Sequence, residues 1–185
     1  MPDLGFSIPE RFNVAEFFVH RNLVEGRGAQ AAVISGERQI TYGQIAQEVD
    51  QAANAFSAAG VLPTDRVFLL LLDSPAFVSA FWGAIKIGAV PIPANTLLGA
   101  EEIVFMWKDS RARCLVVDAS LLDKVRPILV RQPTDRSGGL PTTYVAGGTG
   151  GADSSRRPGV LALHFGQYGQ PQSRHPPSSR LCLLL

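Results

Sequence analysis

The sequence predicts an α/β fold in which helices pack on a mostly parallel β-sheet. Apolar runs of strand length, such as "RVFLLLL" at 66–72, alternate along the chain with segments of helical periodicity. Caps and turn residues separate these two kinds of segment as far as about residue 130. Because parallel strands need a crossover connection, usually a helix, this alternation is typical of a helix-covered parallel sheet.

The first predicted elements are a helix and a hairpin. Asn13 can cap the first helix, and Glu16, three residues later, can reach back to the amide of the cap. The segment "EGRG" at 25–28 ends this helix. Two short β-rich segments lie on either side of Gly36 and Glu37, which predicts a β-hairpin.

The next two helices have clear start and stop signals. Thr41 and Gln44 have the spacing of a reciprocal cap, and Gly60 ends the helix that follows them. After the strand at 66–72, Pro75 suits the first turn of a further helix and Gly88 its end. The remaining predicted elements are a strand at 89–93, a helix at 100–110, a strand at 113–118 and a helix at 120–129.

The composition of the chain changes after Pro133. Residues 134–159 are dominated by Gly, Ser, Thr and Pro, and no helical or strand period returns after them. We therefore expect one globular unit at 9–133, followed at 134–185 by a disordered linker and tail.

Composition and charge argue against several classes of partner. A formal net charge of +1 gives no concentrated basic surface for nucleic acid. No apolar run approaches the ~20 residues of a membrane-spanning helix, and the N-terminus lacks the pattern of a signal peptide, so we expect a cytoplasmic protein. The two cysteines, Cys114 in an apolar run and Cys182 in the tail, have no partners at metal-ligand spacing. We expect Cys114 to be a buried hydrophobic residue.

The residues that could carry chemistry have stronger structural explanations. Lys86, Lys108 and Lys124 are the only lysines, and all lie in or beside predicted helices, where solvated faces are usual. We expect His20 to lie at the surface or at a boundary rather than to act as a base. The Gly-rich segment 146–155 lacks the Lys of a Walker-type loop. The aromatic residues expected in the core rather than around a ligand are Phe77, Phe81, Trp82, Phe105 and Trp107. We assign no catalytic, cofactor-binding or metal-binding residue.

Three motifs carry a resemblance to a known family. The helix start "TYGQI" at 41–45, the strand entry "GVLPTDRV" at 60–67 and the segment "GAVPIPAN" at 88–95 together resemble the N-terminal part of adenylate-forming acyl-CoA synthetases. Within that superfamily the chain resembles the benzoate-CoA ligase family over roughly residues 9–130. The resemblance implies activation of an aromatic carboxylate by ATP and Mg²⁺ to an acyl-adenylate, and then transfer to coenzyme A.

The phosphate-binding loop that this resemblance implies is absent from the written sequence. Residues 157–180 nevertheless allow a codon choice that, read one base later, gives Asp-Pro-Ala-Phe-Trp-Leu-Tyr-Thr-Ser-Gly-Ser-Thr-Gly-Asn-Pro-Lys and further residues, which contains the family's loop. The middle base of each shifted codon is free, but the other two are largely fixed by the written residues. We interpret the tail as frameshifted, with the shift between Gln132 and Arg156.

This interpretation determines the expected activity. The written chain is predicted to be an inactive fragment that retains no cofactor, while ATP, Mg²⁺ and coenzyme A belong to the full-length family. Two alternatives remain open. The tail can be a genuine low-complexity linker, and the chain can be a non-catalytic α/β module that uses its ligase-like surface to bind a partner.

Overall fold

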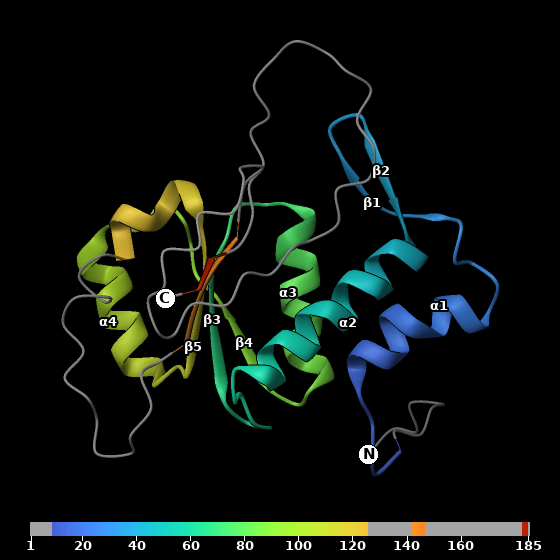
Figure 1. Ribbon diagram of the computed structural model, residues 1–185, viewed down its shortest axis with the longest axis horizontal. Helices are drawn as coiled ribbons and strands as arrows, with labels where there is room; N and C mark the ends of the chain where they lie inside the picture. Colours follow the sequence, from blue (N-terminus) through green and yellow to red (C-terminus); the bar gives the residue numbers. More distant parts are fainter. Residues whose placement is uncertain (1–8, 126–141, 147–182, 185) are drawn as a thin grey trace, which may run out of the picture.

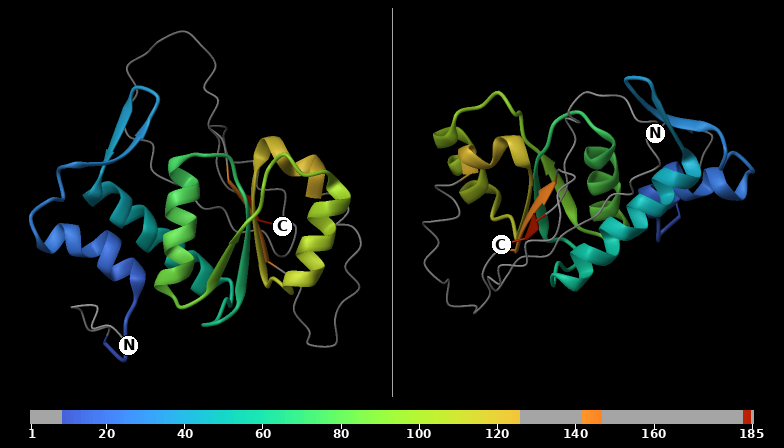
Figure 2. Two further views of the ribbon diagram at one scale, coloured as in Figure 1. Left: turned by 180° about the vertical axis from the view of Figure 1, so that it is seen from behind. Right: turned by 45° about the horizontal axis from the view of Figure 1, so that its top comes forward.

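The computed structural model describes residues 9–125 together with the backbone of 142–146 and 183–184. A central sheet lies between two helical layers, with α2 and α3 on one face and α4 on the other (Figures 1 and 2). The strand order is β4-β3-β5-β6-β7, and every pair is parallel except β6 with β7. These strands are β3 (Arg66–Leu70), β4 (Val90–Pro93), β5 (Cys114–Asp118), β6 (Thr142–Ala146) and β7 (Leu183–Leu184). The predicted α/β class with a mostly parallel sheet is confirmed.

The helical layers and the hairpin complete the described part of the chain. A helical segment at the N-terminus and a two-stranded antiparallel hairpin lie outside the α2–α3 layer (Figure 1). Their bounds are η1 (Glu16–His20), α1 (Arg21–Val24), β1 (Ala31–Ser35), β2 (Arg38–Thr41), α2 (Tyr42–Ala58), α3 (Pro75–Lys86), α4 (Ala100–Ser110) and η2 (Ala119–Leu121).

The apolar run of β3 is explained by burial on both faces of the sheet. Val67 and Leu69 belong to the cluster beneath α2 and α3, while Phe68 and Leu70 belong to the cluster on the α4 side. All four side chains are fully buried. A strand covered on both faces gains from apolar residues at every position, which is why its sequence does not alternate.

The predicted caps of α2 and α3 are present. The Gln44 amide donates to the Thr41 hydroxyl at 3.2 Å, and the Thr41 amide donates to the Gln44 side chain at 2.9 Å. Ser74 precedes Pro75 and accepts a hydrogen bond from an amide in the first turn of α3. Gly60 and Gly88 follow these helices with φ of 76° and 79°, a conformation that glycine adopts without strain.

Helices α2 and α3 approach closely at Gly83. A Cβ atom at this position would lie 2.6 Å from the Cβ of Ala52 and 3.1 Å from the Val49 carbonyl oxygen. The absence of a side chain therefore sets the distance between the two helices. This close contact also brings polar side chains of α2 within reach of α3.

The first helix differs from its prediction in one respect. Asn13 acts as a cap, because its Oδ1 accepts a hydrogen bond from the Ala15 amide at 2.9 Å. Its Nδ2 also donates to the carbonyls of Ile85 and Lys86, which fixes the segment to the end of α3. Glu16 does not complete a capping box, since its carboxylate turns to Lys86. A cation from another helix competes better for this carboxylate than a local amide does.

Strands β6 and β7 lie in the region that was expected to be disordered. Residues 142–146 pair with β5 in parallel, from Cys114 opposite Thr142 to Asp118 opposite Ala146. A five-residue segment has little pattern of its own, and pairing with β5 supplies the order that the sequence does not indicate. The predicted helix 120–129 starts as the short turn η2 and is helical through residue 125, while its remainder and the rest of the predicted tail lie outside the described residues.

Candidate functional site

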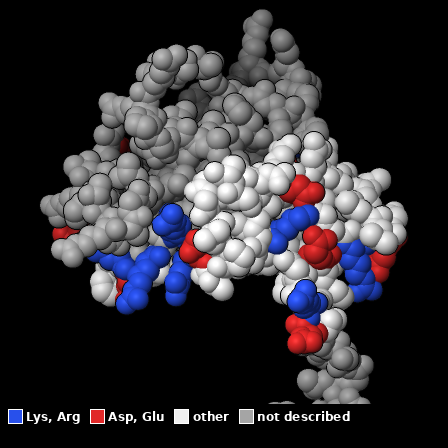
Figure 3. Space-filling model, turned by 60° about the horizontal axis from the view of Figure 1, so that its bottom comes forward, with Lys and Arg blue, Asp and Glu red and all other residues white. Residues whose placement is uncertain are grey.

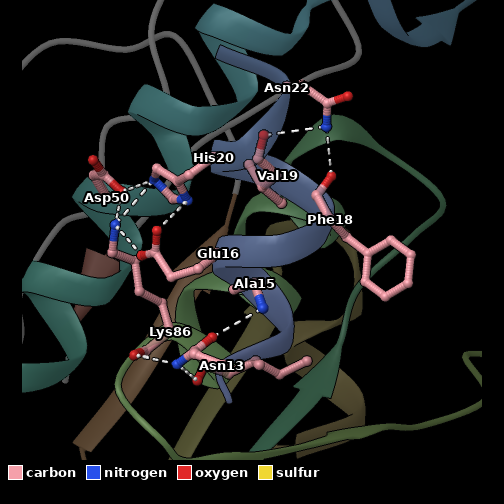
Figure 4. A network of polar contacts seen from close by, with 10 residues as sticks. Asn13, Ala15, Glu16, Phe18, Val19, His20, Asn22, Asp50 and Lys86 are labelled. Atoms are coloured by element: carbon pink, nitrogen blue, oxygen red, sulfur yellow. Dashed lines mark hydrogen bonds and ion pairs between the residues drawn. The ribbon is translucent and has the colours of Figure 1, made fainter. Parts of the chain in front are cut away.

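Four ionisable side chains from three elements meet at one end of the α2–α3 contact (Figure 4). The ammonium of Lys86 lies 2.7 Å from Asp50 Oδ1 and 3.2 Å from Glu16 Oε1. The Nε2 atom of His20 lies 2.7 Å from the same Asp50 oxygen and 2.9 Å from the Lys86 ammonium. We call these four residues the Lys86 network.

The Lys86 network favours the charged forms of Asp50 and Lys86. Burial raises the pKa of Asp50, but hydrogen bonds from Lys86 and His20 outweigh it and leave the pKa below its ordinary value. Burial lowers the pKa of Lys86, but hydrogen bonds to Asp50 and Glu16 leave it above the ordinary value. A lysine held in this way is a poor proton acceptor, so the network is suited to joining helices rather than to acid–base chemistry.

His20 occupies a boundary between η1, α2 and α3. Its side chain is 16% exposed, and its Nδ1 is buried without a hydrogen-bond partner, 3.8 Å from Glu16 Oε2. Because Nε2 faces both an acceptor and a donor, one tautomer cannot satisfy both contacts at once. The environment is that of a boundary residue, as the sequence predicts.

The other two lysines have separate places in the fold. Lys124 donates to the carbonyls of Thr96 at 2.6 Å and Leu98 at 3.0 Å, which fixes the loop after β4. Lys108 is exposed in the last turn of α4, where a positive charge is favourable to the helix dipole. Neither arrangement brings a lysine to a second reactive group.

The predicted aromatic core is correct except at Phe105. Trp107 is 4% exposed and packs edge-on against Phe68. Phe77, Phe81 and Trp82 of α3 are half-buried, and the ring of Phe81 contacts each of the other two. Phe105, by contrast, is 68% exposed. The buried stripe of α4 contains Ile103 and Trp107, and a residue two positions from each lies about 200° round the helix.

The carboxyl ends of parallel strands are where open α/β sheets usually bind ligands. One polar side chain at the end of each of β3, β4 and β5 is engaged in a local turn at this edge. Ser74 caps α3, the Asn95 side chain accepts from the Leu97 amide, and the Asp118 carboxylate accepts from Ser120. These side chains position the loops at the edge rather than form a ligand site.

Within the described residues, no group of three or more His, Cys, Asp or Glu side chains is placed to hold a metal ion. Cys114 is fully buried, and burial raises the pKa of its thiol well above the ordinary value, which confirms its prediction as a core residue.

No helix in the described part of the chain is long and apolar enough to cross a membrane. Basic and acidic side chains are interspersed on the face in Figure 3.

Residues 21–157 match the family of AMP-binding enzymes. The chain belongs to this family. It is 40% identical over 147 residues to the benzoate–CoA ligase of Thauera aromatica, an alignment that covers 79% of this chain and 27% of that ligase. The predicted resemblance to benzoate-CoA ligases is confirmed.

Two solved structures share the fold at recognisable sequence identity. A benzoate CoA ligase from Burkholderia xenovorans LB400 has a TM-score of 0.62 and 34% identity, over 66% of this chain and 24% of the ligase. The anthranilate CoA ligase AuaEII, solved in complex with anthranoyl-AMP, has a TM-score of 0.62 and 34% identity, over 66% of this chain and 23% of that one. The chain thus spans about a quarter of the length of these relatives.

Proposed function

We propose that this chain is the N-terminal part of a ligase that activates an aromatic carboxylate with ATP and transfers it to coenzyme A. The observation that carries the proposal is the 40% identity to a benzoate–CoA ligase over 79% of the chain. Relatives named for hydroxybenzoates and anthranilate support an aromatic acid as the substrate class.

The proposed reaction has two steps. A carboxylate oxygen attacks the α-phosphorus of ATP, so that pyrophosphate leaves and an acyl-adenylate forms. The thiol of coenzyme A then attacks the acyl carbonyl, loses its proton, and displaces AMP. Mg²⁺, backbone amides and a lysine of the phosphate loop would stabilise the charge that develops on the phosphates. We assign none of these groups to residues 9–125, whose role is to build the sheet on which the later parts of a ligase rest.

We further propose that the phosphate loop is encoded one base out of frame from about Arg157. Two observations support this hypothesis. The family match runs in the written frame as far as residue 157, which is where the shifted reading that contains the loop begins. Strand β6 at 142–146 pairs in parallel with β5 and so extends the parallel sheet in the written frame. Together they favour a lesion near the Arg156 end of the interval from Gln132 to Arg156.

Sequencing the gene from about codon 130 tests the frameshift directly. The hypothesis predicts that deleting one base between codons 132 and 156 opens a long reading frame that contains the shifted loop sequence. If neither shifted frame contains further ligase-like sequence, the frameshift is excluded and the linker alternative is favoured.

The frame-restored polypeptide then tests the function. It should catalyse exchange of radiolabelled pyrophosphate into ATP when benzoate or a hydroxybenzoate is present, and the 185-residue chain should not. Exchange by the written chain would contradict the predicted inactivity. If a restored polypeptide that folds shows no exchange with any aromatic acid, the proposed activity is wrong. A soluble, monodisperse 185-residue chain that unfolds cooperatively would then favour the non-catalytic binding module.

A further inference from the structure

Glu48 is a carboxylic side chain buried inside the α2–α3 contact. It is 4% exposed, and none of the ion pairs among the described residues includes it. Its polar partner is Ser79 of α3, which is fully buried and lies 2.8 Å away from hydroxyl oxygen to Glu48 Oε2. A buried glutamate without an ion-pair partner is unusual, because an isolated charge is costly to remove from water.

The hydroxyl of Ser79 determines which group supplies the hydrogen. Its oxygen lies 2.8 Å from Glu48 Oε2 and 3.0 Å from the carbonyl oxygen of Pro75. A hydroxyl has one hydrogen to donate, and a backbone carbonyl can only accept. Both contacts are hydrogen bonds when Ser79 donates to Pro75 and accepts from a protonated Glu48. An ionised Glu48 would compete with Pro75 for the single hydrogen of Ser79.

The surroundings of Glu48 also favour the neutral acid. Burial raises the pKa of Glu48, and this effect exceeds the opposing effects of the Ser79 hydrogen bond and of the Arg38 charge. Arg38 of β2 is the charged side chain that acts on Glu48 from a neighbouring element, and α3 contributes the neutral Ser79. On α2 itself, the neighbouring Ile45 and Val49 are buried apolar residues, which cannot solvate a charge.

We propose that Glu48 is a protonated acid in the folded chain and that its ionisation loosens α2 from α3. At low pH the acid proton closes the chain of hydrogen bonds from Glu48 through Ser79 to Pro75. Loss of the proton leaves a buried negative charge with one shared donor. The α2–α3 contact therefore depends on the proton of Glu48 and is stabilised as the pH falls.

The direction of the effect follows from linkage. Because the pKa of Glu48 is raised in the folded chain, the folded state keeps a proton that the unfolded state has already lost. The stabilisation is full below the ordinary pKa of glutamate, ~4.3, and is lost progressively as the pH rises to the folded pKa. Between these two values the unfolding equilibrium constant should increase roughly tenfold per pH unit through this group.

Urea unfolding of the 185-residue chain as a function of pH tests whether protonation of Glu48 stabilises the fold. Wild type is compared with Glu48→Gln. A glutamine is neutral at every pH and can still donate to Ser79, so the variant should lose the roughly tenfold change per pH unit. Glu37→Gln, which removes an exposed carboxylate from the hairpin, should keep it.

An infrared measurement gives an independent readout that does not depend on cooperative unfolding. The folded wild type should show the carbonyl stretch of a protonated carboxylic acid above the pH at which exposed carboxylates ionise, and Glu48→Gln should lack this band. If the band is absent from the wild type, or if it persists in the variant, the proposal is wrong. Equal pH dependence of unfolding in wild type and Glu48→Gln would also overturn it.

Discussion

Glu48 and Asp50 are carboxylates two residues apart on α2, and the fold treats them in opposite ways. Glu48 lies inside the contact with α3, where burial raises its pKa. Asp50 lies at the edge, 47% exposed, where burial is outweighed by hydrogen bonds from Lys86 and His20 and the pKa is lowered. Residues two apart point about 200° away from each other on a helix. The comparison shows that the neighbouring elements, rather than the residue type, decide the charge.

The contributions of the two carboxylates to stability should change with pH in opposite directions. The contribution of Glu48 is present at low pH and fades as the pH rises. The contribution of Asp50 is present above its ordinary pKa, ~3.9, and is lost as the pH falls through the lower pKa of the folded state. Three substitutions test whether this difference depends on the α2–α3 contact.

The largest effect is expected from Gly83→Ala. The new Cβ would lie 2.6 Å from Ala52 Cβ and would force the helices apart. We expect a loss of about 2–3 kcal/mol in the free energy of unfolding, measured in urea, as is typical of overpacking in a core. The pH dependence due to Glu48 should weaken, because the separated helices admit water. The long side chain of Lys86 should still reach Asp50.

A double variant provides the control for Gly83→Ala. Adding Ala52→Gly removes the closest atom that the new Cβ would meet, so the two substitutions together should cost less than the sum of the separate costs. Additive costs would mean that the close approach of the helices is not the cause.

Lys86→Met should have a smaller effect. It leaves the carboxylates of Glu16 and Asp50 near each other without their shared cation, and we expect a loss of about 1 kcal/mol at neutral pH. Because the pKa of Lys86 is raised in the fold, its contribution is full below the ordinary value, ~10.4, and is lost as the pH rises through the folded value. The difference from wild type in thermal or urea unfolding should therefore shrink in alkali. Lys108→Met, at an exposed position of α4, is the matched control and should change stability little.

Asp50→Asn should have the smallest effect, about 0.5 kcal/mol at neutral pH, because water and salt screen a half-exposed pair. The difference in urea unfolding between wild type and variant should disappear as the pH falls through the lowered pKa of Asp50. The opposite trend, a difference that grows in acid, would contradict the contrast between Asp50 and Glu48. The exposed Asp109 provides a control substitution, Asp109→Asn, on α4.

Features that depend on a few neighbouring residues could be predicted from the sequence. The Thr41–Gln44 cap, the glycines after α2 and α3, and the doubly buried strand β3 follow from spacing and apolar runs. The motifs at 41–45, 60–67 and 88–95 likewise identified the family. These properties are local, since the backbone period and the turn chemistry are set within one or two turns of chain.

Features that depend on distant partners could not be predicted. Helical spacing placed Phe105 in the core with Trp107, but α4 meets the sheet along the stripe that contains Ile103 and Trp107, so Phe105 is exposed. Strand β6 had no recognisable signal because its order comes from pairing with β5. The Lys86 network joins residues 36 to 70 positions apart, from Asp50 and Glu16 to Lys86, and no sequence period relates them.

The sequence by itself determined the α/β class, the family and the shifted phosphate loop as a hypothesis, because each rests on the order of residues along the chain. The tertiary structure decided the charge states on α2. A carboxylate acquires its pKa from the water it loses and the groups it meets. Glu48 and Asp50 meet different groups because they point to different sides of α2, one into the close contact that Gly83 allows with α3 and the other toward His20 and Lys86.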